Sequence, residues 1–205
     1  MSHVTAQFLF DFGSPNAYFC HKVLPHVTAR TGVVFDYVPI LLGGLFRLTN
    51  NRSPMEAFAG IANKRAYDTL EIKRFIAKHR LSEFKMNTFF PVNTLPVMRG
   101  AVAAQRLACF EKYVDVVYSC LWEQSLNMAD AGVAQKALAA AGLDAQAILS
   151  LSQQADVKER LTQNTQEACD RGAFGSPTFF VGDDIFFGKD RLRDVEEEIV
   201  RRLDA

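Results

Sequence analysis

The first forty residues carry the pattern that most constrains the fold. Residues 4–12 alternate loosely and are rich in aromatic side chains, which predicts a buried strand. Ser14-Pro15 then places an N-capping serine before a proline at the first helical position, and apolar residues keep helical spacing until Thr31-Gly32. Residues 33–40 predict a second strand. A strand, a helix and a strand in this order form a βαβ unit, whose two strands lie parallel.

The middle of the chain predicts helices without a convincing strand. Gly142 and Gly172 stand where helices would end, because glycine favours the left-handed conformation that follows a helix. We expect helices over residues 54–79, 94–110, 112–126, 130–141, 144–151 and 155–171. Residues 43–171 would therefore form a helical insertion.

Strands return near the C-terminus. Residues 178–181 and 185–187 flank a short hairpin turn, Gly182-Asp183-Asp184, and a charged amphipathic helix follows over residues 190–203. The order βαβ, helical block, ββα predicts an α/β protein with a thioredoxin-like fold, interrupted by helices as in the disulfide-oxidoreductase (DsbA-like) branch. We expect residues 1–42 and 172–205 to form the thioredoxin-like domain, and residues 43–171 the insertion domain.

Charge and cysteine content argue against several classes of function. Lysine and arginine together number 23, as do aspartate and glutamate, so no global charge favours nucleic acid or an anionic membrane. The four cysteines form no C-x-x-C pair and no cluster with histidine at metal-ligand spacing, which argues against a zinc site and a disulfide framework. The chain start resembles no secretory leader, and no apolar run approaches the roughly 18 residues of a membrane span. We expect a cytoplasmic protein that binds a small molecule.

The turn into the first helix is the first candidate site. In a thioredoxin-like protein the chemistry lies there, because the N–H groups and the dipole of the helix N-terminus stabilise a thiolate. Ser14 stands at the first cysteine position of a C-x-x-C motif and Ala17 at the second, which excludes dithiol exchange at this turn. A serine hydroxyl can instead donate to a bound thiolate. An ordinary N-cap is the alternative that this segment alone leaves open.

A second candidate site precedes the third strand. Ser176-Pro177 is a candidate cis peptide bond. In thioredoxin-like folds this loop faces the N-terminus of the first helix, and the residue before the proline offers its N–H and C=O to an extended peptide. Glutathione is such a peptide. A proline that tightens an ordinary turn is the alternative for this dipeptide taken alone.

Five sequence motifs support the same interpretation. They are D-F-x-S-P-x-x-Y, P-x-L-L-G-G-x-F at residues 39–46, F-P-x-N-T at residues 90–94, Leu121-Trp122, and G-x-F-G-x-P-T-F followed by F-x-G-x-D-R. Together they resemble the 2-hydroxychromene-2-carboxylate isomerase family, whose close relatives are the kappa-class glutathione transferases. The resemblance covers nearly the whole chain, and the last motif is the most specific.

The resemblance implies a glutathione site. Ser14 would contact the glutathione sulfur, Ser176 would offer its backbone before a cis-Pro177, and Asn51 would add a polar contact. The backbone and α-amino end of glutathione would be bound by Phe187, Gly188, Lys189 and Asp190. Relatives often carry an aliphatic residue in place of Ser176, which should be harmless if only backbone atoms matter. They often carry tryptophan in place of Phe187, which could reshape the pocket.

The resemblance also implies a substrate side. Phe46 and Asn93 fall at substrate-side positions, and Lys64 and Arg47 are candidates to meet a substrate carboxylate. For Lys64 a solvated basic helix face, shared with Lys73, Arg74 and Lys78, is the alternative.

The implied reaction is a cis–trans isomerisation of an unsaturated aromatic 2-oxoacid, such as trans-o-hydroxybenzylidenepyruvate, in equilibrium with its hydroxychromene form. The glutathione thiolate would add to the conjugated double bond and would leave after rotation. A kappa-class-like transferase or peroxidase is the first alternative, and a non-catalytic binding protein with the same scaffold is the second. The apolar surface of the helices is compatible with a homodimer and equally with a monomer.

Overall fold

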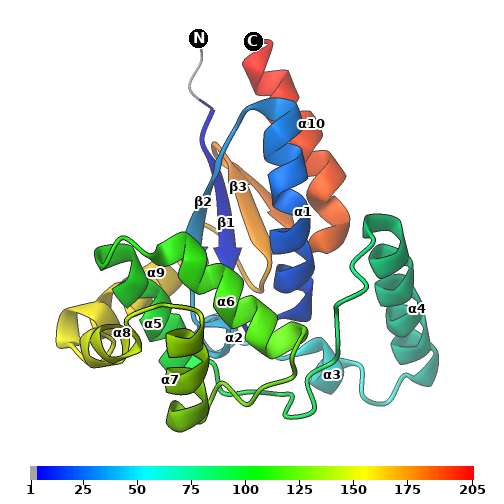
Figure 1. The fold of residues 1–205 in the computed structure, drawn as a ribbon. Helices are drawn as coiled ribbons and strands as arrows, with labels where there is room; N and C mark the ends of the chain where they lie inside the picture. Colours follow the sequence, from blue (N-terminus) through cyan, green and yellow to red (C-terminus); the bar gives the residue numbers. More distant parts are fainter. Residues whose placement is uncertain (1–3) are drawn as a thin grey trace.

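The computed structural model describes residues 4–205, so the first three residues of the predicted 1–42 segment lie outside it. Its centre is a four-stranded sheet with the order β2-β1-β3-β4 (Figure 1). β1 (Ala6–Phe10) pairs in parallel with β2 (Phe35–Pro39), so the predicted βαβ unit is confirmed. β3 (Thr178–Val181) is antiparallel to β1 and to β4 (Asp184–Phe187).

Helix α1 (Pro15–Thr31) connects the two parallel strands, and its ends lie where the sequence places them. Ser14 is the N-cap, since its side chain accepts a hydrogen bond from the Ala17 N–H. Gly32 ends the helix in the left-handed conformation, with φ 73°, and donates its N–H to the Thr28 carbonyl. The apolar face of α1, which includes Tyr18, is buried.

The helical block contains α2 (Leu42–Leu48), α3 (Pro54–Ala57), α4 (Ala62–His79), α5 (Leu95–Arg106), α6 (Phe110–Trp122), α7 (Ala131–Ala140), α8 (Ala145–Leu151) and α9 (Ala155–Asp170). Five of the predicted helices, from residue 94 to residue 171, are confirmed with ends that differ by a few residues. Gly142 and Gly172 follow α7 and α9 with positive φ, as expected. Figure 1 shows α4 apart from α5 to α9, so the block is not one compact bundle.

Three details of the helix prediction are wrong. Residues 54–79 form two helices and not one, because the short α3 ends at Ala57 and Gly60 lies in the break before α4. Helix α2, which passes through Gly43 and Gly44, is not predicted by the sequence, because it is stabilised by burial of Leu45 and not by local propensity. The last helix begins as a 3₁₀ turn, η1 (Lys189–Arg191), before α10 (Leu192–Leu203).

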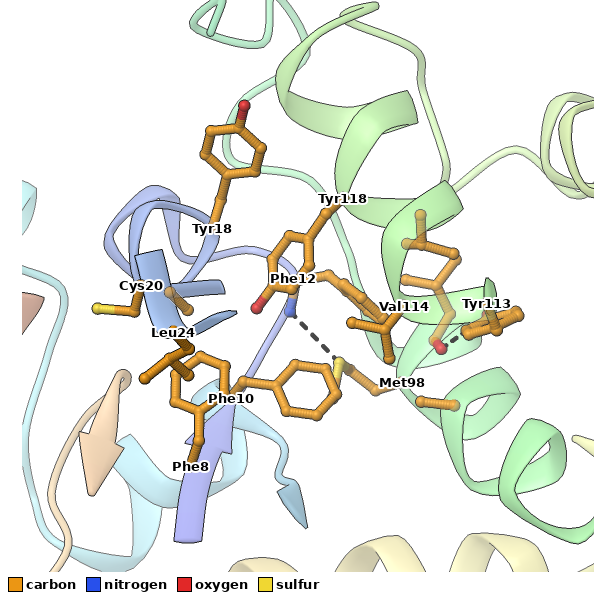
Figure 2. Packing of buried hydrophobic residues seen from close by; sticks show 14 of the residues in the cluster. Phe8, Phe10, Phe12, Tyr18, Cys20, Leu24, Met98, Tyr113, Val114 and Tyr118 are labelled. Carbon is orange, nitrogen blue, oxygen red and sulfur yellow. Dashed lines mark hydrogen bonds between the residues drawn. The ribbon is translucent and has the colours of Figure 1, made fainter. Parts of the chain in front are cut away.

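Within residues 4–205 the larger of two hydrophobic clusters, which is rich in aromatic side chains, joins the sheet to the helical block (Figure 2). Phe10 and Phe12 follow one another at the end of β1, and their rings lie 6.0 and 4.8 Å from the ring of Tyr118 on α6. All four strands lie in the two segments that we expect to form the thioredoxin-like domain. We propose that the predicted division describes the order of segments along the chain, and that the two parts pack together through both clusters. The smaller cluster joins Leu9 and Phe180 of the sheet to Leu45 on α2 and Ala168 on α9.

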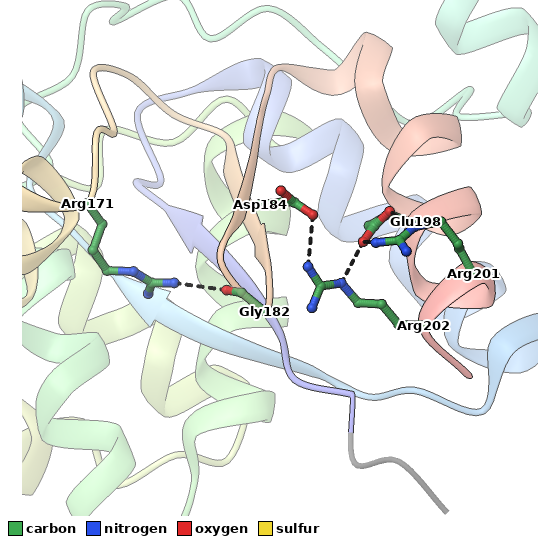
Figure 3. Close-up of polar contacts among 6 residues, drawn as sticks. All are labelled: Arg171, Gly182, Asp184, Glu198, Arg201 and Arg202. Carbon is green, nitrogen blue, oxygen red and sulfur yellow. Dashed lines mark hydrogen bonds and ion pairs between the residues drawn. The ribbon is translucent and has the colours of Figure 1, made fainter. Parts of the chain in front are cut away.

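Ion pairs fix the far end of the β3–β4 hairpin (Figure 3). Arg202 on α10 donates to Glu198 at 2.5 Å and to Asp184 at 2.8 Å, and Arg171 donates to the Gly182 carbonyl at 3.3 Å. The hairpin is therefore bonded to Arg202 on α10 and to Arg171 at the end of α9. These bonds fix β3, the strand into which residues 174–177 lead. No helix within residues 4–205 has the length and apolar content that crossing a membrane requires.

Candidate functional site

Ser14 and Ser176 meet at the N-terminus of α1, although 162 residues separate them in the chain. The Ser14 hydroxyl donates to the Ser176 carbonyl at 2.9 Å and accepts from the Ala17 N–H at 3.2 Å. Both serines are buried. Ser14 is therefore an N-cap and also faces the loop before β3, so the two interpretations of this serine are compatible. Its hydroxyl lies where the helix dipole favours a negative charge.

The Ser176-Pro177 peptide bond is cis, as the sequence suggested. The Pro177 carbonyl accepts from the Gly188 N–H at 2.9 Å, and the Thr178 hydroxyl donates to the Gly175 carbonyl at 2.8 Å. These bonds hold the loop at residues 174–177, hereafter the cis-proline loop, against the start of η1.

A buried carboxylate holds the turn that carries Ser14. Asp11 follows β1, and its Oδ1 accepts from the Gly13 N–H at 2.8 Å and from the Thr94 hydroxyl at 2.7 Å. Its Oδ2 accepts from the Leu42 N–H at 2.8 Å. Burial raises the pKa of Asp11 above its ordinary range, and the three donors oppose this rise. One side chain thus joins the turn to the starts of α2 and α5.

Two helices of the insertion hold the same turn from the other side. The Trp122 indole N–H on α6 donates to the Phe12 carbonyl at 2.8 Å. The Phe12 N–H donates to the Met98 sulfur on α5 at 3.4 Å, as Figure 2 shows. Asp11, Thr94 and Trp122 were not predicted as site residues, although each belongs to a motif that carried the resemblance. The motifs contain these three residues, but only the fold shows that their side chains meet at the turn that carries Ser14.

Three of the predicted glutathione-binding residues lie against the cis-proline loop. The Asn51 side-chain amide donates to the Phe174 carbonyl at 2.9 Å. The Phe187 ring lies 4.5 Å from the Phe174 ring and packs on Gly175, where an added Cβ would lie 2.6 Å from the Phe187 ring. Gly188, with φ 96°, follows directly. Phe174 and Phe187 are both partly exposed and form an aromatic edge beside Ser176.

The last two predicted glutathione residues differ from one another. Lys189 is buried, and its ammonium pairs with Asp190 at 2.5 Å and lies 5.1 Å from the centre of the Phe75 ring. The Asp190 side chain is 69% exposed. Both residues line a groove of about 510 Å³ between α1, α4 and α10. The two side chains are each other's partner, and the exposed Asp190 carboxylate has the capacity to accept from a second ammonium group as well.

The family model of the DSBA-like thioredoxin domain matches residues 5–200 of this chain. The chain belongs to the DsbA-like thioredoxin family. It is 25% identical over 198 residues to a 2-hydroxychromene-2-carboxylate isomerase of Sphingobium xenophagum, covering 96% of this chain and 98% of the relative. It is 26% identical over 202 residues to an enzyme of the same name from Pseudomonas sp. strain C18, covering 96% and 90%.

Solved structures confirm the fold of this DsbA-like chain. A 2-hydroxychromene-2-carboxylate isomerase structure superposes with a TM-score of 0.83 at 23% identity, over 96% of this chain and 95% of the other. A probable DsbA oxidoreductase from Streptomyces coelicolor superposes with a TM-score of 0.74 at 15% identity, over 98% and 91%. The predicted thioredoxin-like fold with a helical insertion is therefore confirmed.

The predicted substrate-side residues are less closely connected than the glutathione side. Phe46 is half-buried on α2, and Arg47 beside it is exposed. Lys64 on α4 pairs with Asp68 and lies 5.1 Å from the Phe58 ring. Asn93 is exposed and accepts from the Leu95 N–H at 3.1 Å. Within residues 4–205 no hydrogen bond or ion pair links these side chains to Ser14, so their roles stay predictions.

The cysteines of this DsbA-like chain do not replace the missing dithiol. All four are free, and burial raises the pKa of the Cys20, Cys109 and Cys120 thiols. Among the described residues, no group of three or more histidine, cysteine or acidic side chains is placed to hold a metal ion. The functional group that the turn offers is the Ser14 hydroxyl.

Proposed function

We propose that this protein is a glutathione-dependent isomerase of 2-hydroxychromene-2-carboxylate and of trans-o-hydroxybenzylidenepyruvate-type aromatic oxoacids. The observation that carries the proposal is the Ser14 hydroxyl, which lies at the N-terminus of α1 and 2.9 Å from the carbonyl that precedes cis-Pro177. The curated relatives that match the chain over 95–96% of its length support the substrate class through their name.

The first task of Ser14 is to keep a bound thiol ionised. A free thiol with a pKa of about 8.5 is only a few per cent ionised at neutral pH. A hydrogen bond to a charged group contributes about 1.5–3 kcal/mol, which corresponds to one or two pKa units. The Ser14 hydroxyl has one proton, which it gives to the Ser176 carbonyl. Donation to a thiolate requires this proton to turn away from the carbonyl, which a peptide N–H of glutathione can then satisfy.

The surrounding residues fit the rest of a γ-glutamyl tripeptide. Asn51 and Gly188 each donate a hydrogen bond to a carbonyl of the cis-proline loop and so fix the loop, whose backbone at Ser176 would pair with a peptide. The partly exposed Phe174 and Phe187 rings offer apolar contact beside it. The exposed Asp190 carboxylate offers a partner for the α-amino group.

Bound glutathione would supply a thiolate that adds to the conjugated double bond and leaves after rotation, so that it is regenerated. The protein holds the acceptor close to the sulfur and meets its carboxylate. Lys64 suits the second task, because its exposed pair with Asp68 contributes only about 0.3–0.5 kcal/mol and is readily replaced by a substrate carboxylate. Phe46, Arg47 and Asn93 complete the proposed acceptor side.

The test is an absorbance assay of oxoacid isomerisation with and without glutathione, combined with titration of free thiol before and after turnover. We expect isomerisation to require glutathione and the thiol titre to stay constant. A titre that falls in proportion to product would instead indicate a transferase or peroxidase. Equal rates with and without glutathione would contradict glutathione dependence.

A further inference from the structure

The side chain of Ser176 makes contacts that the sequence analysis did not anticipate. The exchange with the aliphatic residue of relatives should be harmless on the condition that only backbone atoms matter. In the structure the Ser176 hydroxyl accepts from the Asp11 N–H at 3.2 Å and lies 3.4 Å from the Leu9 carbonyl, which can take its proton. Both partners belong to the end of β1 and the start of the turn that carries Ser14. Side-chain atoms of Ser176 thus bond to the turn as well, and the effect of an aliphatic residue here stays a prediction.

Three hydrogen bonds close a ring around this turn. The Ser14 hydroxyl donates to the Ser176 carbonyl, the Ser14 N–H donates to the Asp11 carbonyl at 3.0 Å, and the Asp11 N–H donates to the Ser176 hydroxyl. The three residues are 5%, 1% and 8% exposed in the order Ser14, Asp11, Ser176. When the Ser14 proton turns to a bound thiolate, the other two bonds still join the turn to the loop, and water cannot readily replace them at this depth.

We propose that Ser176 is a positioning residue. Its hydroxyl fixes the position of the Ser14 hydroxyl relative to the cis-proline loop and thereby determines how far the pKa of the bound thiol is lowered. The proposal rests on the glutathione site proposed above. Without the hydroxyl, the Asp11 N–H loses its acceptor and the ring opens between the turn and the loop. The Asp11 carboxylate keeps its bonds to Gly13, Leu42 and Thr94, so the turn itself stays folded. Removal of the Ser176 hydroxyl should therefore change the alignment of the Ser14 hydroxyl with the cis-proline loop and leave the turn folded.

The test compares Ser176→Ala, Ser176→Thr and Ser176→Val. Threonine and valine have nearly the same shape, and only threonine retains the hydroxyl. The measurement is the thiol pKa of bound glutathione, taken from the ultraviolet absorbance of the thiolate as a function of pH at saturating glutathione. We expect the alanine and valine variants to lower the thiolate-to-thiol ratio about threefold to tenfold, and the threonine variant to stay close to the wild type.

A matched control is Ser152→Ala, which removes a buried serine hydroxyl at the C-terminal end of α8, where it donates to the Leu149 carbonyl at 2.7 Å and contacts neither Asp11 nor the cis-proline loop. It should lose stability in urea and keep the wild-type thiol pKa. A wild-type thiol pKa in Ser176→Ala, or equal values in the threonine and valine variants, would overturn the positioning role. A wild-type protein that binds glutathione without lowering its thiol pKa, or does not bind it, would instead contradict the glutathione site itself.

Discussion

The two sides of the proposed site are built in different ways. On the glutathione side, Asp11, Ser14 and Ser176 are buried and hydrogen-bonded to one another. On the acceptor side, Lys64 belongs to α4, a helix of 18 residues whose only buried residue is Phe75. The fold therefore fixes the residues of the proposed thiol site by buried hydrogen bonds, whereas surface side chains make up the proposed acceptor side. Substitutions on the two sides should differ in kind, with stability and thiol acidity affected on one and substrate affinity on the other.

The largest expected effect is that of Asp11→Ala, which tests whether the glutathione side is built by buried polar groups. The change leaves the Gly13 and Leu42 N–H groups and the Thr94 hydroxyl without their acceptor. We expect the free energy of unfolding in urea to fall by about 3 kcal/mol or more. Asp68→Ala on α4 is the control and should cost less than about 0.5 kcal/mol. Similar losses in both variants would remove the contrast between the two sides.

An intermediate effect is expected where the cis-proline loop contacts the aromatic edge. In Gly175→Ala the new methyl group collides with the Phe187 ring, since a Cβ there lies 2.6 Å from the nearest ring atom. We expect a loss of about 1–3 kcal/mol in stability together with weaker glutathione binding. In a Phe187→Ala background the same glycine substitution should have little further effect, because the collision is gone. Additive losses across this double-mutant cycle would show that Phe187 does not shape the loop.

The smallest expected effect is that of Lys64→Ala, which sharpens the comparison from the acceptor side. Stability should change by less than about 0.5 kcal/mol, because the pair with Asp68 is exposed. The glutathione Kd should stay the same, while the KM for the aromatic oxoacid rises severalfold. An unchanged KM would support the alternative of a solvated basic helix face and would remove Lys64 from the substrate side.

The sequence predicted the parts of the molecule that local chemistry determines. Ser14-Pro15 and Gly32 define the ends of α1 because capping depends on adjacent residues. Ser176-Pro177 was recognised as a candidate cis bond because only proline commonly allows one, and the structure has it. The order of strands and helices then identified the thioredoxin-like fold.

The hydrogen-bond network around the turn could not be predicted from the sequence, because the residues that it joins are distant in the chain. The Asp11 carboxylate bonds to residues 13, 42 and 94, and no periodicity connects these positions. The partners of the Ser176 hydroxyl are equally distant in sequence, since Leu9 on β1 and Asp11 in the following turn lie more than 160 residues away. The break between α3 and α4 was missed because Gly60 is a weak signal inside a region of otherwise helical composition.

The central claim is that Ser14 stabilises a glutathione thiolate at the N-terminus of α1. Calorimetric titration with glutathione near pH 7, in two buffers of different ionisation enthalpy, measures both the affinity and the protons released on binding. We expect the wild type to bind glutathione with proton release, and Ser14→Ala to bind with little or none, at a cost in stability of about 1 kcal/mol for the lost cap. Equal proton release from both proteins, or no binding to the wild type at millimolar glutathione, would contradict the account.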